Sequence, residues 1–229
     1  FADQTGQPCT ACHIGGFGPQ LTPYGRQFKI EGYTARTNDR AIPFSAMLNT
    51  SFTRTTKDQA APPAPHFGVN NNAAVDEGSL FLAGGLGEHL GGFVQSTYSG
   101  IDRHLAWDNV DMRAVTSSFD IGSTDMRLGL SLNNAPTVQD AWNTLPVWGF
   151  PYTSSDLAPK PTGTPLIRDG LGQNSLGLSA YAWIGSQLYA ETGLYRSLSR
   201  DALSLVGTPL DGTSTIDGAG SVGWHTSIA

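Results

Sequence analysis

Three residues near the start of the chain could carry redox or metal chemistry: Cys9, Cys12 and His13. They form a C-x-x-C-H motif that uses both cysteines of the chain. With this spacing both thiols can lie on one side of a single turn and bond to the two vinyl groups of one haem, while the His13 imidazole is placed to ligate the iron. The motif therefore predicts one covalently bound haem c, attached through Cys9 and Cys12, with His13 as an axial ligand.

Two other uses of the cysteine pair are weaker. A redox dithiol is expected next to a βαβ pattern and would leave His13 without a role. A zinc site would need two further soft ligands, and the chain has no other cysteine.

A six-coordinate haem needs a second axial group, normally His or Met. We expect His66, because the prolines before it stiffen its loop and lower the entropy cost of presenting the imidazole. Met47 is the alternative, since it stands among Ser45, Asn49 and Ser51 on the polar side of an alternating segment. The other candidates are His89, His104, His225, Met112 and Met126.

Residues 1–40 are expected to form an irregular haem c attachment segment. The run from Ile14 to Pro19 is too rich in glycine and proline for a helix. Glycine allows backbone to lie close to a porphyrin, and aromatic or cationic side chains can cover its face or pair with its propionates. The residues expected to pack on the haem are Gly15, Phe17, Tyr24 and Arg26.

The remainder, residues 41–229, shows the period-two alternation of β-strands. In the segment 126–132 every second residue is apolar, and Ile42, Phe44, Leu48 and Phe52 share one face of an earlier segment. Hairpins are expected around Gly87-Glu88 and Gly185-Ser186, with further strands near 104–116 and 217–228. The predicted fold is all-β, with antiparallel strands in a barrel or barrel-like sheet.

Short turns alternating with long loops, at 55–76 and 133–176, are typical of an outer-membrane barrel. Aromatic residues near strand ends would form its interfacial girdles: Tyr98, Trp107, Tyr181, Trp183, Tyr189 and Tyr195. A soluble β-sandwich, with these aromatics in its core, is the alternative.

Composition limits the partners and the location. Charged residues make up only 14% of the chain and its net charge is −6, which argues against nucleic acid as a partner. No stretch approaches the ~20 apolar residues of a membrane-spanning helix. A start at Phe1-Ala2-Asp3 fits a mature exported product, as covalent haem c also requires.

The runs CTACHIGGFGPQLTPYGRQFK, DNVDMRA and LGLSLNNAPTVQDAWNTLPVWGFPY resemble a group of bacterial outer-membrane-type monohaem c cytochromes with a porin-like β-barrel, similar to the fused cytochrome–porins of iron-oxidising bacteria. The resemblance implies electron transfer at or across the outer membrane or at the cell surface, with redox partner proteins or extracellular iron as partners. Members of that group are longer than this chain. The interior of an eight-stranded barrel is filled by side chains, so a haem on an open sheet or between subunits of a homo-oligomer is the competing arrangement.

Electron transfer is the leading functional prediction, with the protein acting as a carrier and not as an enzyme. Two alternatives belong to other classes. One is a structural or filament-forming multimeric cytochrome subunit, for which the aromatic-rich loop at 142–152 would be an interface. The other is a haem peroxidase or gas sensor, which requires an open distal position on the iron.

Overall fold

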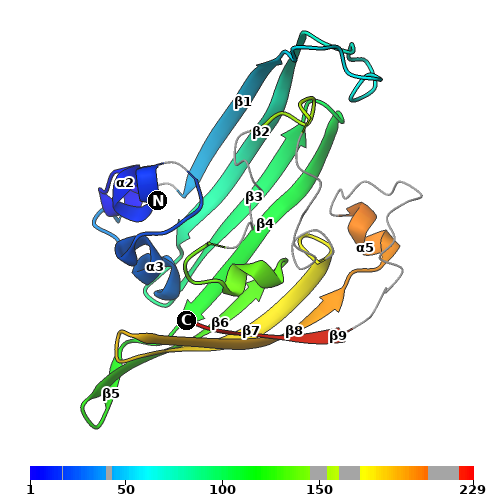
Figure 1. Cartoon of the computed structure of the whole chain (residues 1–229). Helices are drawn as coiled ribbons and strands as arrows, with labels where there is room; N and C mark the ends of the chain where they lie inside the picture. Colours follow the sequence, from blue (N-terminus) through cyan, green and yellow to red (C-terminus); the bar gives the residue numbers. More distant parts are fainter. Residues whose placement is uncertain (17, 40–42, 145–153, 160–170, 206–221) are drawn as a thin grey trace.

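The computed structural model describes residues 1–16, 18–39, 43–144, 154–159, 171–205 and 222–229, and its main feature is one antiparallel sheet (Figure 1). The all-β prediction is confirmed. The strands are β1 (Phe44–Thr53), β2 (Asn72–Gly85), β3 (Leu90–Ser99), β4 (His104–Val115), β5 (Phe119–Ile121), β6 (Thr124–Asn133), β7 (Ser175–Ile184), β8 (Leu188–Ser197) and β9 (Val222–Ile228).

The sheet is open in the part of the chain that the structure describes. Its strand order is β1-β2-β3-β4-β6-β7-β8-β9, with β5 paired to β6 as a short extension. β1 and β9 are the two edges and do not pair with each other, so a closed barrel is not formed by these strands. The sheet is strongly curved, and β7 to β9 run in a different direction from β1 to β4 (Figure 1).

Most predicted strands are found where the alternation places them. The hairpins β2–β3 and β7–β8 turn around Gly87 and Gly185, whose backbones have positive φ. The loop expected over 55–76 is shorter, because β2 already begins at Asn72 and pairs with β1 from Thr53 onward. Ile42 and residues 217–221 of the predicted strands lie outside the described residues.

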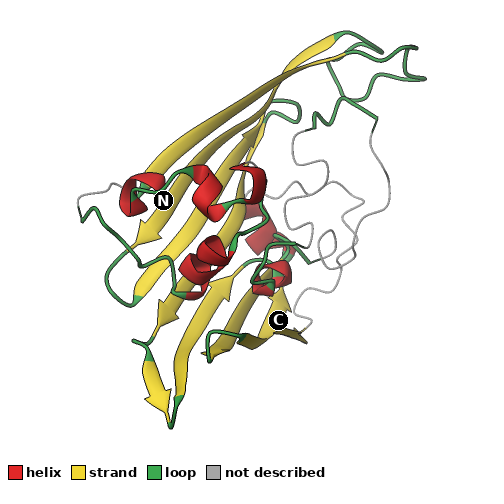
Figure 2. Ribbon diagram, turned by 60° about the vertical axis from the view of Figure 1, so that its left-hand side comes forward, coloured by secondary structure: helices red, strands yellow, loops and turns green. Residues whose placement is uncertain are grey.

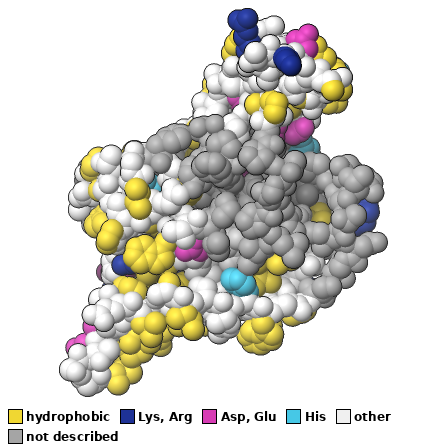
Figure 3. Space-filling view, in the orientation of Figure 1, with side chains coloured by type: hydrophobic (Ala, Val, Ile, Leu, Met, Phe, Trp, Pro, Cys, Tyr) yellow, Lys and Arg dark blue, Asp and Glu magenta, His cyan; other side chains and the backbone are white. Residues whose placement is uncertain are grey.

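The two faces of the sheet have opposite chemistry. One row across five strands joins Met112, Leu132, Leu178, Leu194 and Trp224 on the outer face. Every long strand exposes large apolar side chains on this face. Further examples are Phe44, Leu48, Phe52, Leu80, Leu82, Leu90, Leu105, Trp107, Leu128, Leu130, Leu176 and Leu188. Figure 3 shows hydrophobic side chains gathered along the lower border of the molecule, where β6 to β8 lie in Figure 1.

The inner face is polar and aromatic, and it corrects the predicted girdles. Tyr181, Trp183, Tyr189 and Tyr195 are all buried on it. The ring of Tyr181 lies over Gly129 on the neighbouring strand, and the ring of Tyr195 lies over Gly177, so closely that a Cβ at either glycine would overlap the ring. Tyr98 and Trp107 do project outward and are exposed.

The inner face is covered by helices, which Figure 2 shows on one side of the sheet. Residues 1–40 were predicted to be irregular, but the structure contains helices in this segment. They are α1 (Ala2–Thr5), α2 (Cys9–Cys12), the 3-10 turn η1 (Ile14–Gly16) and α3 (Pro23–Ile30). Two further short helices are η2 (Pro136–Gln139) and α5 (Arg200–Leu205). None of the described helices is long and apolar enough to cross a membrane.

Helix α3 has clear local causes. Thr22 accepts a hydrogen bond from Gly25 N as N-cap, and Pro23 occupies the first turn, where its missing N–H costs nothing. The helix is followed by Gly32 and Tyr33, which both have left-handed backbones with φ of 69° and 61°. This termination turns the chain back so that Tyr33 enters the interior.

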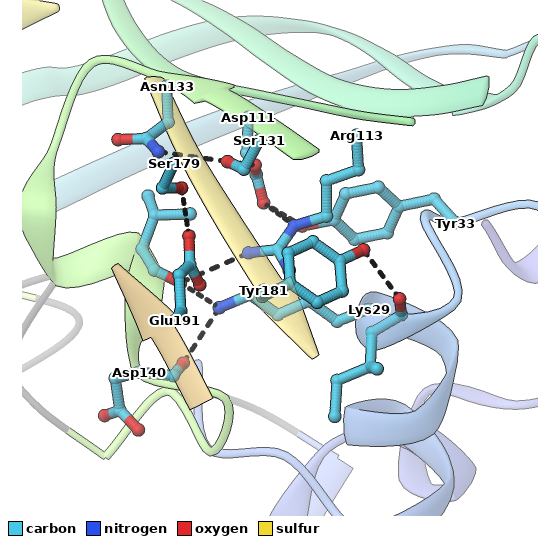
Figure 4. Close-up of polar contacts among 12 residues, drawn as sticks. Lys29, Tyr33, Asp111, Arg113, Ser131, Asn133, Asp140, Ser179, Tyr181 and Glu191 are labelled. Atoms are coloured by element: carbon cyan, nitrogen blue, oxygen red, sulfur yellow. Dashed lines mark hydrogen bonds and ion pairs between the residues drawn. The ribbon is translucent and has the colours of Figure 1, made fainter. Parts of the chain in front are cut away.

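Arg113 is the centre of the buried polar network on the inner face (Figure 4). Its side chain is fully buried, and Nε lies 2.8 Å from Oδ2 of Asp111. The guanidinium also donates to Tyr189 and to the carbonyl of Val138, at 3.4 Å each. Asp111 accepts from Ser131 as well, so the charged pair is satisfied by protein groups.

We predict that Arg113→Met lowers the free energy of unfolding by about 3–5 kcal/mol, because it leaves Asp111 as an uncompensated buried charge. Arg127→Met is the matched control: Arg127 forms a partly exposed pair with Glu31 at 3.3 Å, which contributes about 0–1 kcal/mol. Denaturant melts followed by circular dichroism measure both. Equal effects of the two substitutions would contradict the central role of Arg113.

Candidate functional site

The C-x-x-C-H motif is built on a single helical turn. His13 N donates to the carbonyl of Cys9 at 2.9 Å, which closes the turn that carries Cys9 and Cys12 at its two ends. Thr22 N donates to the carbonyl of Cys12 at 2.9 Å and its hydroxyl donates to the carbonyl of Ala11. The N-cap of α3 therefore fixes α2 in place.

A cavity of about 270 Å³ lies between this turn and the inner face of the sheet. Cys9, Cys12 and His13 all line it. Its volume lies just below the range of about 300–1,000 Å³ that is typical of small-molecule sites. The two thiols and the imidazole thus line one partly open cavity.

Aromatic rings form much of the cavity wall. Phe1, Phe28, Tyr33 and Phe93 line it. Phe1 packs edge-on against Phe28, with centroids 4.9 Å apart, and stacks on Tyr33 at 5.3 Å. Leu21 and Val138 add apolar surface. Such a wall suits a flat apolar ligand.

Polar groups line another part of the cavity: Lys29, Asn109, Asp111 and Asn143. The Tyr33 hydroxyl donates to Oδ2 of Asp111 at 2.6 Å. The Lys29 ammonium donates to the carbonyls of Val138 and Asp140 and to Oδ1 of Asn143, at 2.7–2.9 Å. In Figure 4, Tyr33 points toward Asp111 and Arg113, and the Lys29 ammonium reaches the carbonyl of Asp140.

Burial shifts the pKa values of Lys29 and Tyr33. It lowers the pKa of Lys29 to about 8, and the neighbouring Arg113 charge acts in the same direction. Burial, followed by the negative charge of Asp111, raises the pKa of Tyr33 well above its ordinary value. Tyr33 therefore remains a neutral hydrogen-bond donor at neutral pH.

His13 has features that suit a metal ligand. Nδ1 is buried, and backbone groups of Gly18 and Pro19 hydrogen-bond to the imidazole. Burial lowers the pKa of His13, and the nearby backbone of Gly18 and Pro19 opposes this only in part. A neutral imidazole is the form that binds metal. The residues present fit a haem whose iron His13 would ligate.

The cysteines do not have the properties of a redox dithiol. Burial, together with the neighbouring Cys9, raises the pKa of Cys12, whereas reactive thiols have a lowered pKa. Cys9 is exposed and Cys12 is half-buried. Within the described ranges, no group of three or more His, Cys, Asp and Glu side chains could hold a metal ion without further ligands.

The structure does not bring the two predicted sixth ligands to this cavity. His66 lies in the β1–β2 loop with a left-handed backbone (φ 71°) and is exposed. Met47 does share the polar face of its strand, as expected, since it pairs with Ser79, but its sulfur lies near Asn49 at 3.9 Å. Neither residue lines the cavity.

The residues expected to pack on the haem are also placed elsewhere. Gly15 and Tyr24 are exposed and do not line the cavity. The guanidinium of Arg26 lies 3.5 Å from the ring centroid of Trp142 and does not face the cavity. Phe17 lies outside the described residues.

Sequence analysis missed most of the residues that build the walls. Phe1 and Phe28 carried a usable signal, because they belong to the predicted attachment segment. The sequence signal for Asp111 and Asn109 was weaker. Both are polar residues in an alternating strand, on the face opposite Val110 and Met112. Tyr33 gave none, because its position depends on the left-handed turn after α3.

Comparisons of the chain with protein-family models, with curated proteins and with solved structures find no match. The site is therefore interpreted from its own geometry.

Gly25 controls the packing of α3 on the motif. A Cβ at this position would overlap the carbonyl of Cys12. We predict that Gly25→Ala separates the two helices and lowers the free energy of unfolding by about 1–3 kcal/mol, the usual range for overpacking. Gly223→Ala is the control, because a Cβ there meets nothing within 4 Å. Thermal melts compare the two; a neutral Gly25→Ala would show that α2 and α3 can move apart freely.

Proposed function

We propose that this chain is a monohaem c-type electron-transfer protein. Cys9 and Cys12 would form thioether bonds to one haem and His13 would ligate the iron. The single observation that carries the proposal is the cavity that both thiols and the imidazole line together. When bound, the haem would supply reversible one-electron chemistry.

The chain's own residues would do three things for such a group. The rings of Phe1, Phe28 and Phe93 would exclude water from its faces. The exposed position of Cys9 would leave the attachment edge near solvent, where a redox partner protein or extracellular iron could exchange electrons. The buried hydrogen-bonded network of Lys29, Tyr33 and Asp111 would provide a rigid polar floor, which limits reorganisation.

The outer face supports the second part of the proposal, a location in the bacterial outer membrane. Apolar side chains point outward on all eight long strands, while polar ones are buried on the inner face. This is the reverse of a soluble β-sheet protein and the pattern of a membrane β-protein. Exposed apolar patches of this extent normally have a partner, and we propose lipid acyl chains.

The strand edges belong to the same proposal. β1 and β9 present ten and seven residues of edge strand respectively, and exposed edges of this length are normally covered. Closure of a barrel, the finer form of the predicted fold, would follow from pairing of these edges with a neighbouring subunit in a homo-oligomer.

Covalent haem attachment is the direct test. We expect the exported protein to carry one haem that survives denaturing electrophoresis, and the mass of the chain to rise by one haem. Cys9→Ala with Cys12→Ala should abolish both signals because no thioether can form. Free haem recovered from an otherwise folded wild-type chain, with both thiols still titratable, would reject the proposal.

The membrane location predicts an effect that depends on the position of a charge. Leu178→Lys, on the apolar face, should destabilise the protein in lipid vesicles by about 2–4 kcal/mol, because the ammonium would lie among acyl chains. Leu205→Lys is the control, because Leu205 is 86% exposed on α5, away from the strands. Denaturation curves of both variants in vesicles measure this difference. A Leu178→Lys variant that is neutral in vesicles would contradict a lipid-facing sheet.

A further inference from the structure

All residues that normally supply the second axial bond to a haem iron can be located in this structure. The chain has five histidines and three methionines, and every one of them lies in the described residues. His13 alone among these eight lines the cavity. The cavity that His13 lines therefore contains no second histidine or methionine that could ligate the iron.

The seven others are engaged or displaced in ways that the fold explains. Met112 and Met126 project from the outer face, as their partners Leu132 and Ile184 do. Nδ1 of His225 lies 2.7 Å from Oε1 of Gln139. The remaining four are His66 in the β1–β2 loop, His89 in the β2–β3 turn, His104 at the start of β4 and Met47 on β1.

Most polar side chains at the cavity have no free capacity to bind iron. The three hydrogens of the Lys29 ammonium are used by three acceptors, one of which is Asn143. Asp111 accepts from Tyr33, Arg113 and Ser131. A group so fully bonded would have to give up these bonds to become an iron ligand.

Tyr33 differs from them, because its hydroxyl makes one bond, to Asp111, and keeps acceptor capacity on its oxygen. Its backbone has a φ of 61°, unusual for a bulky residue. The conformation is held by Gln4, whose amide donates to the Tyr33 carbonyl at 2.8 Å, and by the ring of Phe1. Such conformations persist only where the surroundings impose them, and they cluster at ligand sites.

We propose that the iron held by His13 has no second His or Met ligand from this chain, and that its sixth position opens toward the Tyr33–Asp111 pair. A small neutral diatomic molecule, such as carbon monoxide, binds there against the ring of Tyr33, whose hydroxyl proton is donated to Asp111; the Asp111 carboxylate disfavours an anionic ligand at this position. This inference rests on the proposed haem attachment and adds ligand binding to electron transfer.

The experiment uses the purified protein with its covalent haem. We expect a high-spin ferric spectrum by electron paramagnetic resonance, and binding of carbon monoxide by the reduced protein. His66→Ala and Met47→Ala should leave both unchanged. Tyr33→Phe keeps the stacked ring and removes only the hydroxyl that donates to Asp111, so the variant should still bind carbon monoxide.

Several outcomes would overturn the inference while leaving the proposed function intact. These are a low-spin wild type that does not bind carbon monoxide, a spin change on His66→Ala or Met47→Ala, and a low-spin state that becomes high-spin on dilution, which would place the ligand on a second copy. Where Tyr33→Phe fails to fold, the wild-type spectrum and the carbon monoxide titration decide alone. A chain without covalent haem would instead reject the proposed function itself.

Discussion

The buried pair of Arg113 and Asp111 is the interaction on which the rest of the structure depends. An antiparallel sheet with one apolar face normally buries that face. Here the apolar face is outside, so the covered face must be stabilised by polar and aromatic groups. A buried charge is tolerated only when it is paired and hydrogen-bonded. Arg113 satisfies this condition with Asp111, Tyr189 and Val138, and it thereby joins strands β4 and β8 to the turn at η2.

The same network connects the motif segment to the sheet. Lys29 bonds to the η2 segment, Tyr33 bonds to Asp111, and the carbonyl of Ile30 accepts from Tyr181 at 2.7 Å. These three bonds come from the last turn of α3 and the residues just after it, while the first turn of α3 holds α2. A displacement of α3 would therefore move the cavity wall and the motif together. Because most of these bonds are buried, they give the segment a defined position rather than a loose attachment.

The sequence allowed the sheet to be predicted better than the site. Strand positions follow from alternation, which survives in this chain because each face has one chemical character. The same alternation also predicts which face the aromatic residues of β7 occupy. Tyr181 and Trp183 are odd-numbered, like Gly177 and Ser179, and therefore lie on the face opposite Leu176 and Leu178. The girdle prediction weighed aromatic type over parity and was wrong for those residues. Parity, read strictly, assigns them to the inner face.

The cavity could not be predicted in the same way, because its walls come from segments that are distant in sequence. Asp111 reaches Tyr33 across 78 positions, and Lys29 reaches Asn143 across 114. Neither contact leaves a local pattern. Tyr33 is the clearest case: a left-handed conformation at a bulky residue is disfavoured by local sterics, so only the completed interior can impose it. Local sequence specifies the motif that would bind a haem, whereas the long-range packing of α3 on the polar face decides what that haem would meet on its other side.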